Sequence, residues 1–158
     1  MKIDRQDIYS TALRFLELLR NEKSGTQIEI ESLELALDQL ALAHHFVGED
    51  INDDNEYPDP PAKDDSQWRE LIGKRFQNLG YYNTPIAVST NIGESEMGSG
   101  DAIDDLVDIA SELSEFVWRW ENTSENNALW YFHFTYKTHW SNHLRDLQMY
   151  LQAIQSEQ

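Results

Sequence analysis

The sequence predicts an all-α protein, a single-domain bundle of about five helices. Apolar residues recur every three or four positions over five stretches, which is the spacing of amphipathic helices. Residues that favour helix ends flank these stretches, and 158 residues are enough for one domain with a sizeable core. We therefore expect one helical domain over residues 1–158, with a long C-terminal helix antiparallel to the fourth.

The first apolar stretch predicts a helix over residues 4–22, which Ser24 and Gly25 end. Thr26 then stands three residues before Glu29, the spacing of a capping box at the start of the next helix. These signals separate the first helix from the second.

The second helix, predicted over residues 28–47, is apolar on two nearly opposite sides. Leu33 and Leu40 lie on one side, and Leu35 and Leu42 lie on the other. Such a helix is either central in a bundle or shared with a second subunit. We expect the central position, and a homodimer through the second helix is the alternative.

Two segments between the predicted helices have the composition of connections. Residues 49–65 are rich in Asp, Glu and Asn and contain three prolines, so we expect a mobile acidic linker. A third helix is predicted over residues 66–79, followed by an apolar piece over 81–88 that Pro85 interrupts. Residues 89–100 are rich in Gly and Ser and predict a loop.

The last two helices are predicted over residues 100–121 and 125–154, and their short connection makes them antiparallel neighbours. The fourth has one apolar face and an acidic ladder along one flank. The apolar stripe of the fifth includes Trp140, with His143 near its centre and His139 at its edge. Three aromatic residues fall outside the main stripes, so we expect them to cover a neighbouring element or to line a partner groove. They are Trp118, Trp130 and Tyr131.

Composition limits the function. The chain has no Cys, which excludes disulfides, thiol nucleophiles and Cys-ligated metal sites. A net charge of −17 disfavours binding to nucleic acid. Charged residues recur from the second position, and no run of about twenty apolar residues exists, so we expect no signal peptide and no membrane span. These features predict a soluble cytoplasmic protein that binds neither nucleic acid nor membranes.

The histidines of the fifth helix are the first candidates for chemistry. His139 and His143 are four residues apart, so both could reach one metal ion from one helical face. The Glu that zinc proteases use as a base is missing between them. Since His143 faces the core, its ring must form a hydrogen bond, and Asp105 is the best placed partner. We expect a buried pair of Asp105 with His143, and metal binding is the alternative.

Carboxylates of the fourth helix are the other candidate ligands, because divalent cations such as Mg²⁺ prefer carboxylate oxygens. An acidic helix start also complements the helix dipole, so a solvated surface is the simpler interpretation. We expect no catalytic residue and no cofactor. The candidate polar cluster is Asp104, Asp105, His139, Trp140 and His143. The candidate metal ligands are Asp101, Asp105, Asp108, Glu112, His139 and His143.

The C-terminal half of the chain resembles a known family. The segment over residues 100–109, followed by Trp130, the pair His139-Trp140 and then His143, is similar to a bacterial domain-of-unknown-function family, number 5063. The resemblance implies a small helical bacterial protein, and it implies no reaction.

Two functions are compatible with these features. The first is a non-enzymatic, acidic protein-interaction domain that binds another protein, favoured by the net charge, the acidic linker and the lack of a complete catalytic set. The alternative is a divalent-metal-dependent hydrolase of a phosphorylated small molecule. Helical nucleotide pyrophosphohydrolases hold Mg²⁺ on carboxylate-rich helices, to which the fourth helix is faintly similar.

Overall fold

The computed structural model describes residues 1–21 and 27–157. The expected stop at Ser24 and Gly25, and the capping box that starts at Thr26, lie outside the described residues. The elements are α1 (Arg5–Arg20), α2 (Gln27–His44), α3 (Asp65–Arg75), β1 (Tyr81–Pro85), β2 (Met97–Asp101), α4 (Ala102–Asn122), α5 (Glu125–Thr135), the π-helical turn η1 (Tyr136–Trp140) and α6 (Ser141–Ser156).

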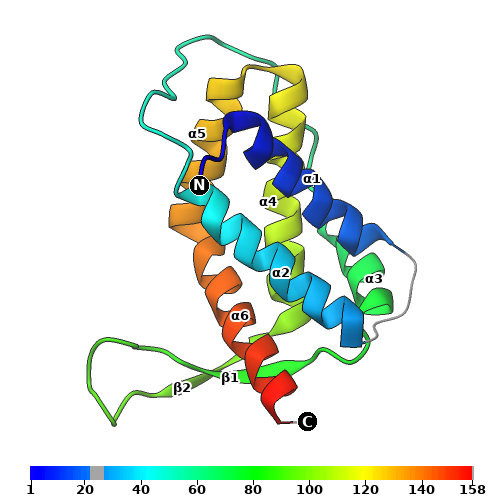
Figure 1. The fold of residues 1–158 in the computed structure, drawn as a ribbon, viewed down its shortest axis with the longest axis vertical. Coiled ribbons are helices and arrows are strands. Elements are labelled where there is room, and N and C mark those ends of the chain that lie inside the picture. The colour runs from blue at the N-terminus through cyan, green and yellow to red at the C-terminus, as the bar shows by residue number, and fades with distance from the viewer. Residues whose placement is uncertain (22–26, 158) are drawn as a thin grey trace.

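The helices form a bundle, and the predicted all-α class is confirmed apart from one short hairpin. In Figure 1, α4 runs through the middle, with α1 and α2 crossing in front of it. The run α5–η1–α6 returns beside α4, so the two are antiparallel as predicted. No described helix is both long and apolar enough to cross a membrane.

The buried side chains of the described residues gather in one apolar cluster to which every helix contributes. From α2, Leu33 and Leu40 are fully buried in this cluster, whereas Leu35 and Leu42 are exposed. The expected central position of this helix is therefore wrong, because only one of its two apolar sides is covered within the chain. A homodimer through the other side stays a prediction.

The β-hairpin replaces part of the predicted loop. β1 and β2 pair antiparallel from Tyr81 opposite Asp101 to Pro85 opposite Met97. The loop expected over residues 89–100 is thus wrong for its last four residues, which belong to a strand. The paired strand also moves the start of α4 to Ala102.

A glycine within this hairpin allows two elements to approach closely. A Cβ atom at Gly100 would overlap the ring of Tyr82, which lies across it. The bare backbone therefore lets the Tyr82 ring cross β2 and reach the start of α4.

The predicted fifth helix contains a wide turn. In η1 the backbone N–H of Ser141 donates to the carbonyl oxygen of Tyr136, five residues earlier. Four buried side chains in and beside this turn follow one another at intervals of four residues; they are Phe132, Tyr136, Trp140 and Leu144. Over three such steps an α-helix would rotate the side chains by about 120°. The π turn absorbs this rotation, and turns of this kind are frequent at functional sites.

The segment before α3 is extended, and its first residues contact the bundle. Arg5 donates to the carbonyl oxygen of Asp50 at 2.9 Å, and Ile51 is buried in the core. Asn126 donates to the carbonyl oxygen of Asn52 at 3.1 Å. The mobility expected for residues 49–65 stays a prediction, whereas these contacts fix where the segment begins.

His44 packs among rings, and its own ring forms no hydrogen bond with the described residues. Its centroid lies 3.7 Å from that of Tyr136 and 5.1 Å from that of His133. Both His44 ring nitrogens and Nδ1 of His133 are buried with no hydrogen-bond partner among the described residues. Burial, together with the nearby histidines and cations, lowers the pKa of His44 to about 4.

We expect His44 to make the fold sensitive to mild acid. In the unfolded chain this ring gains a proton near pH 6.5, whereas the folded chain resists protonation down to about pH 4. The unfolded state therefore binds more protons between these two values, so the free energy of unfolding falls as the pH falls from about 6.5 to about 4. Denaturant titrations of wild type and His44→Phe should diverge in this window. The exposed neighbour His45 supplies the control, and His45→Phe should follow wild type.

Candidate metal centre

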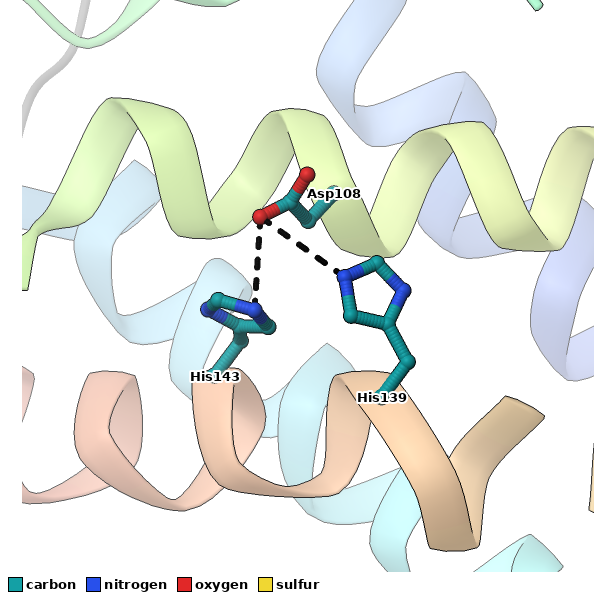
Figure 2. A group of neighbouring side chains, drawn as sticks. All are labelled: Asp108, His139 and His143. Carbon is teal, nitrogen blue, oxygen red and sulfur yellow. Dashed lines mark ion pairs between the residues drawn. The ribbon is translucent and has the colours of Figure 1, made fainter.

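Three potential metal ligands converge between α4 and the returning helices. One ligand atom each from Asp108, His139 and His143 lies within 4.8 Å of the others, the one such group among the described residues. Oδ2 of Asp108 is 3.3 Å from Nε2 of His143 and 4.0 Å from Nε2 of His139. Figure 2 shows both imidazoles pointing from their helix across to the carboxylate on α4.

The helices explain this convergence. His139 and His143 are one turn apart, so they lie on the same face, which is turned toward α4. Asp105, Asp108 and Glu112 are three or four residues apart, so they form a row of carboxylates along the facing side of α4. Because the two runs are antiparallel, the later carboxylate meets the earlier histidine.

Each histidine is held by a second carboxylate through its other ring nitrogen. Nδ1 of His143 lies 2.7 Å from Oδ1 of Asp105, and Nδ1 of His139 lies 2.9 Å from Oε1 of Glu112. An ionised carboxylate only accepts, so each Nδ1–H must donate to it. In the neutral form of each ring this fixes the tautomer and leaves the lone pair of Nε2 facing Asp108. Histidines that bind metal ions are oriented by carboxylates in this way.

Asp105 and Glu112, the two outer carboxylates that bind Nδ1 of the histidines, accept further hydrogen bonds. The hydroxyl of Tyr82 donates to Asp105, and the hydroxyl of Tyr131 donates to Glu112. Burial, followed by these carboxylates, raises the pKa of both tyrosines, so their hydroxyls stay protonated at neutral pH. Nζ of Lys63 lies 2.9 Å from Oε2 of Glu112. These contacts hold the outer carboxylates in place behind the histidines.

The electrostatics differ between the inner and outer carboxylates. Burial raises the pKa of Asp108, the inner one. Burial would also raise the pKa of Glu112, but hydrogen bonds from Tyr131, Lys63 and His139 outweigh it and lower the value. The hydrogen bond to Asp105 raises the pKa of His143. A cation held by Asp108, His139 and His143 would neutralise the Asp108 carboxylate, whose charged form burial disfavours.

The separations suit a small divalent ion. With bonds of about 2.0–2.2 Å, ligand atoms around tetrahedral Zn²⁺ are about 3.3–3.6 Å apart. The observed separations are 3.3 and 4.0 Å from Asp108, with all three ligand atoms within 4.8 Å of one another, so the side chains must draw closer together to bind such an ion. The side chains of Asp108, His139 and His143 are 28%, 42% and 27% exposed, so the centre opens to solvent on one side. Three protein ligands with an open position are typical of catalytic zinc sites.

The structure brings together most of the residues that the sequence singled out. The predicted pair of Asp105 with His143 is present, but only Asp105 is buried, whereas the His143 side chain is partly exposed. The predicted candidates Asp108, Glu112 and His139 lie beside it. Metal binding by any of them stays a prediction.

The remaining candidates lie elsewhere. Asp101 caps α4 by accepting from the backbone of Ile103 and Asp104, and Asp104 pairs with Arg69 of α3. Trp140 is fully buried in the core.

Sequence reasoning missed three donors at this site, namely Lys63, Tyr82 and Tyr131. Tyr131 carried a partial signal, because it lies outside the main stripe of its helix. The other two come from a connecting segment and from the hairpin. Their positions depend on long-range packing, which local periodicity does not encode.

Comparisons with known proteins bear on the fold and the family. The crystal structure of protein BF1032 from Bacteroides fragilis is similar to this chain with a TM-score of 0.71. The two are 17% identical, over 93% of this chain and 89% of that chain, so the likeness shows the fold alone. No curated protein matches the chain. The family model described as Domain of unknown function (DUF5063) matches residues 4–157, and the chain therefore belongs to this family, as the resemblance implied.

Proposed function

We propose that this protein binds a divalent transition-metal ion, with Zn²⁺ the best match, and acts as a metal-dependent hydrolase. The ligands are Asp108, His139 and His143. One observation carries the proposal. Both Nε2 atoms face the same carboxylate oxygen, while both Nδ1 atoms are held by separate carboxylates.

The main rival is a purely structural pair. A second proton on His143 would let its ring bridge Asp105 and Asp108, and the raised pKa of His143 is consistent with this. That proton gives no partner to Nε2 of His139, which lies 4.0 Å from Asp108, too far for a hydrogen bond, so the contact with Glu112 alone would orient this ring. A single metal ion accounts for the orientation of both histidines.

The donor set indicates which metal and which chemistry. Two imidazole nitrogens and one carboxylate oxygen suit Zn²⁺ and its first-row neighbours better than Mg²⁺, which prefers oxygen ligands. At an open position such an ion lowers the pKa of bound water to about 7 and supplies a hydroxide nucleophile near neutral pH. The partial exposure of all three side chains gives solvent access to the centre.

Calorimetric titration of the metal-free protein with Zn²⁺ tests the proposal. We expect one site per chain, and Asp108→Asn should weaken it by about 100-fold or more, because the amide is a poor ligand for the metal. The matched control is Asp104→Asn, which removes the same charge from the same helix one turn earlier, where the side chain faces Arg69. It should bind like wild type. Binding should also weaken as the pH falls, since protons compete for the histidines.

Two results would contradict the metal centre. One is wild-type binding no tighter than the weak attraction of Zn²⁺ to an acidic surface. The other is an equal loss in the Asp108→Asn and Asp104→Asn variants, which would mean that overall charge, and not a defined site, attracts the ion.

A protein-interaction role is the second proposal, and one exposed aromatic pair supports it. Trp130 and Phe134 stack with their ring centroids 5.1 Å apart on the outer side of α5, and they are 45% and 48% exposed. Exposed large aromatics often anchor protein interfaces. Absence of a zinc site would leave this non-enzymatic role as the better supported function.

A further inference from the structure

A groove lies between β1 of the hairpin and the C-terminal part of α6 (Figure 1). We call it the β1–α6 groove. It has a volume of about 310 Å³, at the lower end of the range for small-molecule sites, about 300–1,000 Å³. The residues that α6 and its end contribute have the spacing of one helical face; they are Asp146, Met149, Tyr150, Ala153, Ile154 and Glu157.

The middle of the β1–α6 groove is aromatic and apolar. The rings of Tyr82 and Tyr150, which both line it, stack with their centroids 4.9 Å apart. Their hydroxyls are already engaged, since Tyr82 donates to Asp105 and Tyr150 accepts from the backbone N–H of Gly80 at 3.1 Å. The tyrosines therefore present their rings to a ligand, and the side chain of Met149 beside them is 65% exposed. Such a lining favours a ligand with an aromatic body.

The charge of the β1–α6 groove favours a cation. Among the described residues that line it, the charged side chains are both carboxylates, Asp146 and Glu157. Asp146 is partly buried, and burial raises its pKa. Its Oδ1 accepts one long hydrogen bond from Thr84, at 3.4 Å, and no described cation pairs with either of its oxygens. A partly buried carboxylate without a cationic partner has a desolvation cost that a bound cation would offset.

The lack of a cationic partner distinguishes Asp146 from the shielded carboxylates of α4. Glu112 lies 2.9 Å from both Lys63 and His139, and Glu115 is paired with Arg119 at 2.8 Å. Asp146 instead lies beside a pair of stacked tyrosines. A carboxylate next to aromatic rings is an arrangement that binds ammonium groups, because the rings also attract a cation through their faces.

We propose that the β1–α6 groove binds a small arylalkylamine, a primary amine on a short chain that ends in an aromatic ring. The ammonium group binds Asp146, with the hydroxyl oxygen of Thr84 as a second acceptor, and the ring packs on Tyr150 and Met149. This site goes beyond the proposed metal-dependent function, and its occupation requires no metal ion.

Calorimetric titration of the full chain with phenethylamine in EDTA at neutral pH tests the proposal. We expect one site per chain, and Asp146→Asn should weaken binding by about tenfold or more, because it removes the charged acceptor. Ala153→Phe should weaken binding as well, because it fills the groove without changing any charge. The matched control is Asp38→Asn, which removes the same charge next to a different side of α6, where Asp38 accepts from Gln148. It should bind like wild type.

Two related molecules separate the contribution of the charge from that of the ring. Phenethyl alcohol keeps the ring and lacks the ammonium group, whereas methylammonium keeps the charge and lacks the ring. Both should bind more weakly than phenethylamine. Methylammonium binding as tightly as phenethylamine would overturn the aromatic part of the proposal, and equally tight binding of the alcohol would overturn the role of Asp146.

Three results with the protein variants would overturn the site itself. The first is absence of binding to wild type. The second is equal weakening by Asp146→Asn and Asp38→Asn, which would mean that the overall negative charge attracts the amine. The third is equal binding by wild type and Ala153→Phe, which would place the amine outside the groove. Because every titration is run in EDTA, these results do not depend on the proposed metal centre.

Chemical denaturation without ligand distinguishes a binding role of Asp146 from a structural one. We expect Asp146→Asn to retain the free energy of unfolding of wild type, because the carboxylate has no cation to lose and an amide oxygen can still accept from Thr84. A loss of stability in Asp146→Asn, together with unchanged binding of phenethylamine, would assign this residue to the packing of the hairpin and overturn the inference.

Discussion

Replacing Trp140 with Ala should lower the free energy of unfolding by about 3–5 kcal/mol, the range for large aromatic residues in cores. The indole is fully buried and packs edge-on against Phe132 and Tyr136 with centroids 5.3 and 4.8 Å apart. Its Nε1 donates to the hydroxyl of Thr135 at 3.1 Å, and that residue is also buried. Chemical denaturation of the metal-free protein measures the loss.

Trp130 is the matched control for this prediction. It lies on the same helical run but is 45% exposed and stacks only on Phe134. Trp130→Ala should cost less than about 1 kcal/mol, because little apolar area leaves the core. Similar losses in the two variants would show that the core around η1 does not depend on the buried indole.

His143→Ala should destabilise the metal-free protein by about 2 kcal/mol near pH 6, because it leaves the buried Asp105 carboxylate without its cationic partner. Tyr82 still donates to that carboxylate, which keeps the cost at the lower end of the usual range. Since Asp105 raises the pKa of His143, the stabilising pair is complete below about pH 6.5. Its contribution is lost as the pH rises through the raised value of the folded state.

The pH series separates pairing from simple loss of packing. Urea titrations of wild type and His143→Ala should differ most near pH 6 and least at alkaline pH. The variant His45→Ala, at an exposed position directly after α2, should change stability little at either pH. A His143→Ala effect near zero, or one that does not vary with pH, would contradict the pairing.

The sequence was informative where local periodicity decides the structure. The spacing of His139 and His143, and the row of carboxylates on the facing helix, were sufficient to predict the pair of Asp105 with His143. A polar side chain on an apolar helix face must form a hydrogen bond, and its expected partner is the nearest polar group of the helix packed against it. Asp108, predicted as one of six candidate metal ligands, lies at the centre of the cluster.

The parts that could not be predicted depend on contacts distant in sequence or on a departure from ideal helical geometry. Lys63 reaches Glu112 from an irregular segment whose path no periodic pattern describes. The π turn left a trace in the sequence, because apolar residues spaced four apart, as Phe132, Tyr136 and Trp140 are, rotate progressively away from one face of an α-helix. The hairpin was not predicted, because the glycines of β2 have no side chains and so the strand lacks an alternation of apolar and polar residues.

Gly100 supplies no ligand, yet it influences the candidate metal centre because it sets the position of Tyr82. Any side chain there would push the phenol ring of Tyr82 off its present path and away from Asp105. The carboxylate would then lose its neutral donor and depend on the imidazole alone, which would strengthen the hold of that ring on its proton. A methyl group on the hairpin could in this way change the competition between proton and metal at an imidazole that it never touches.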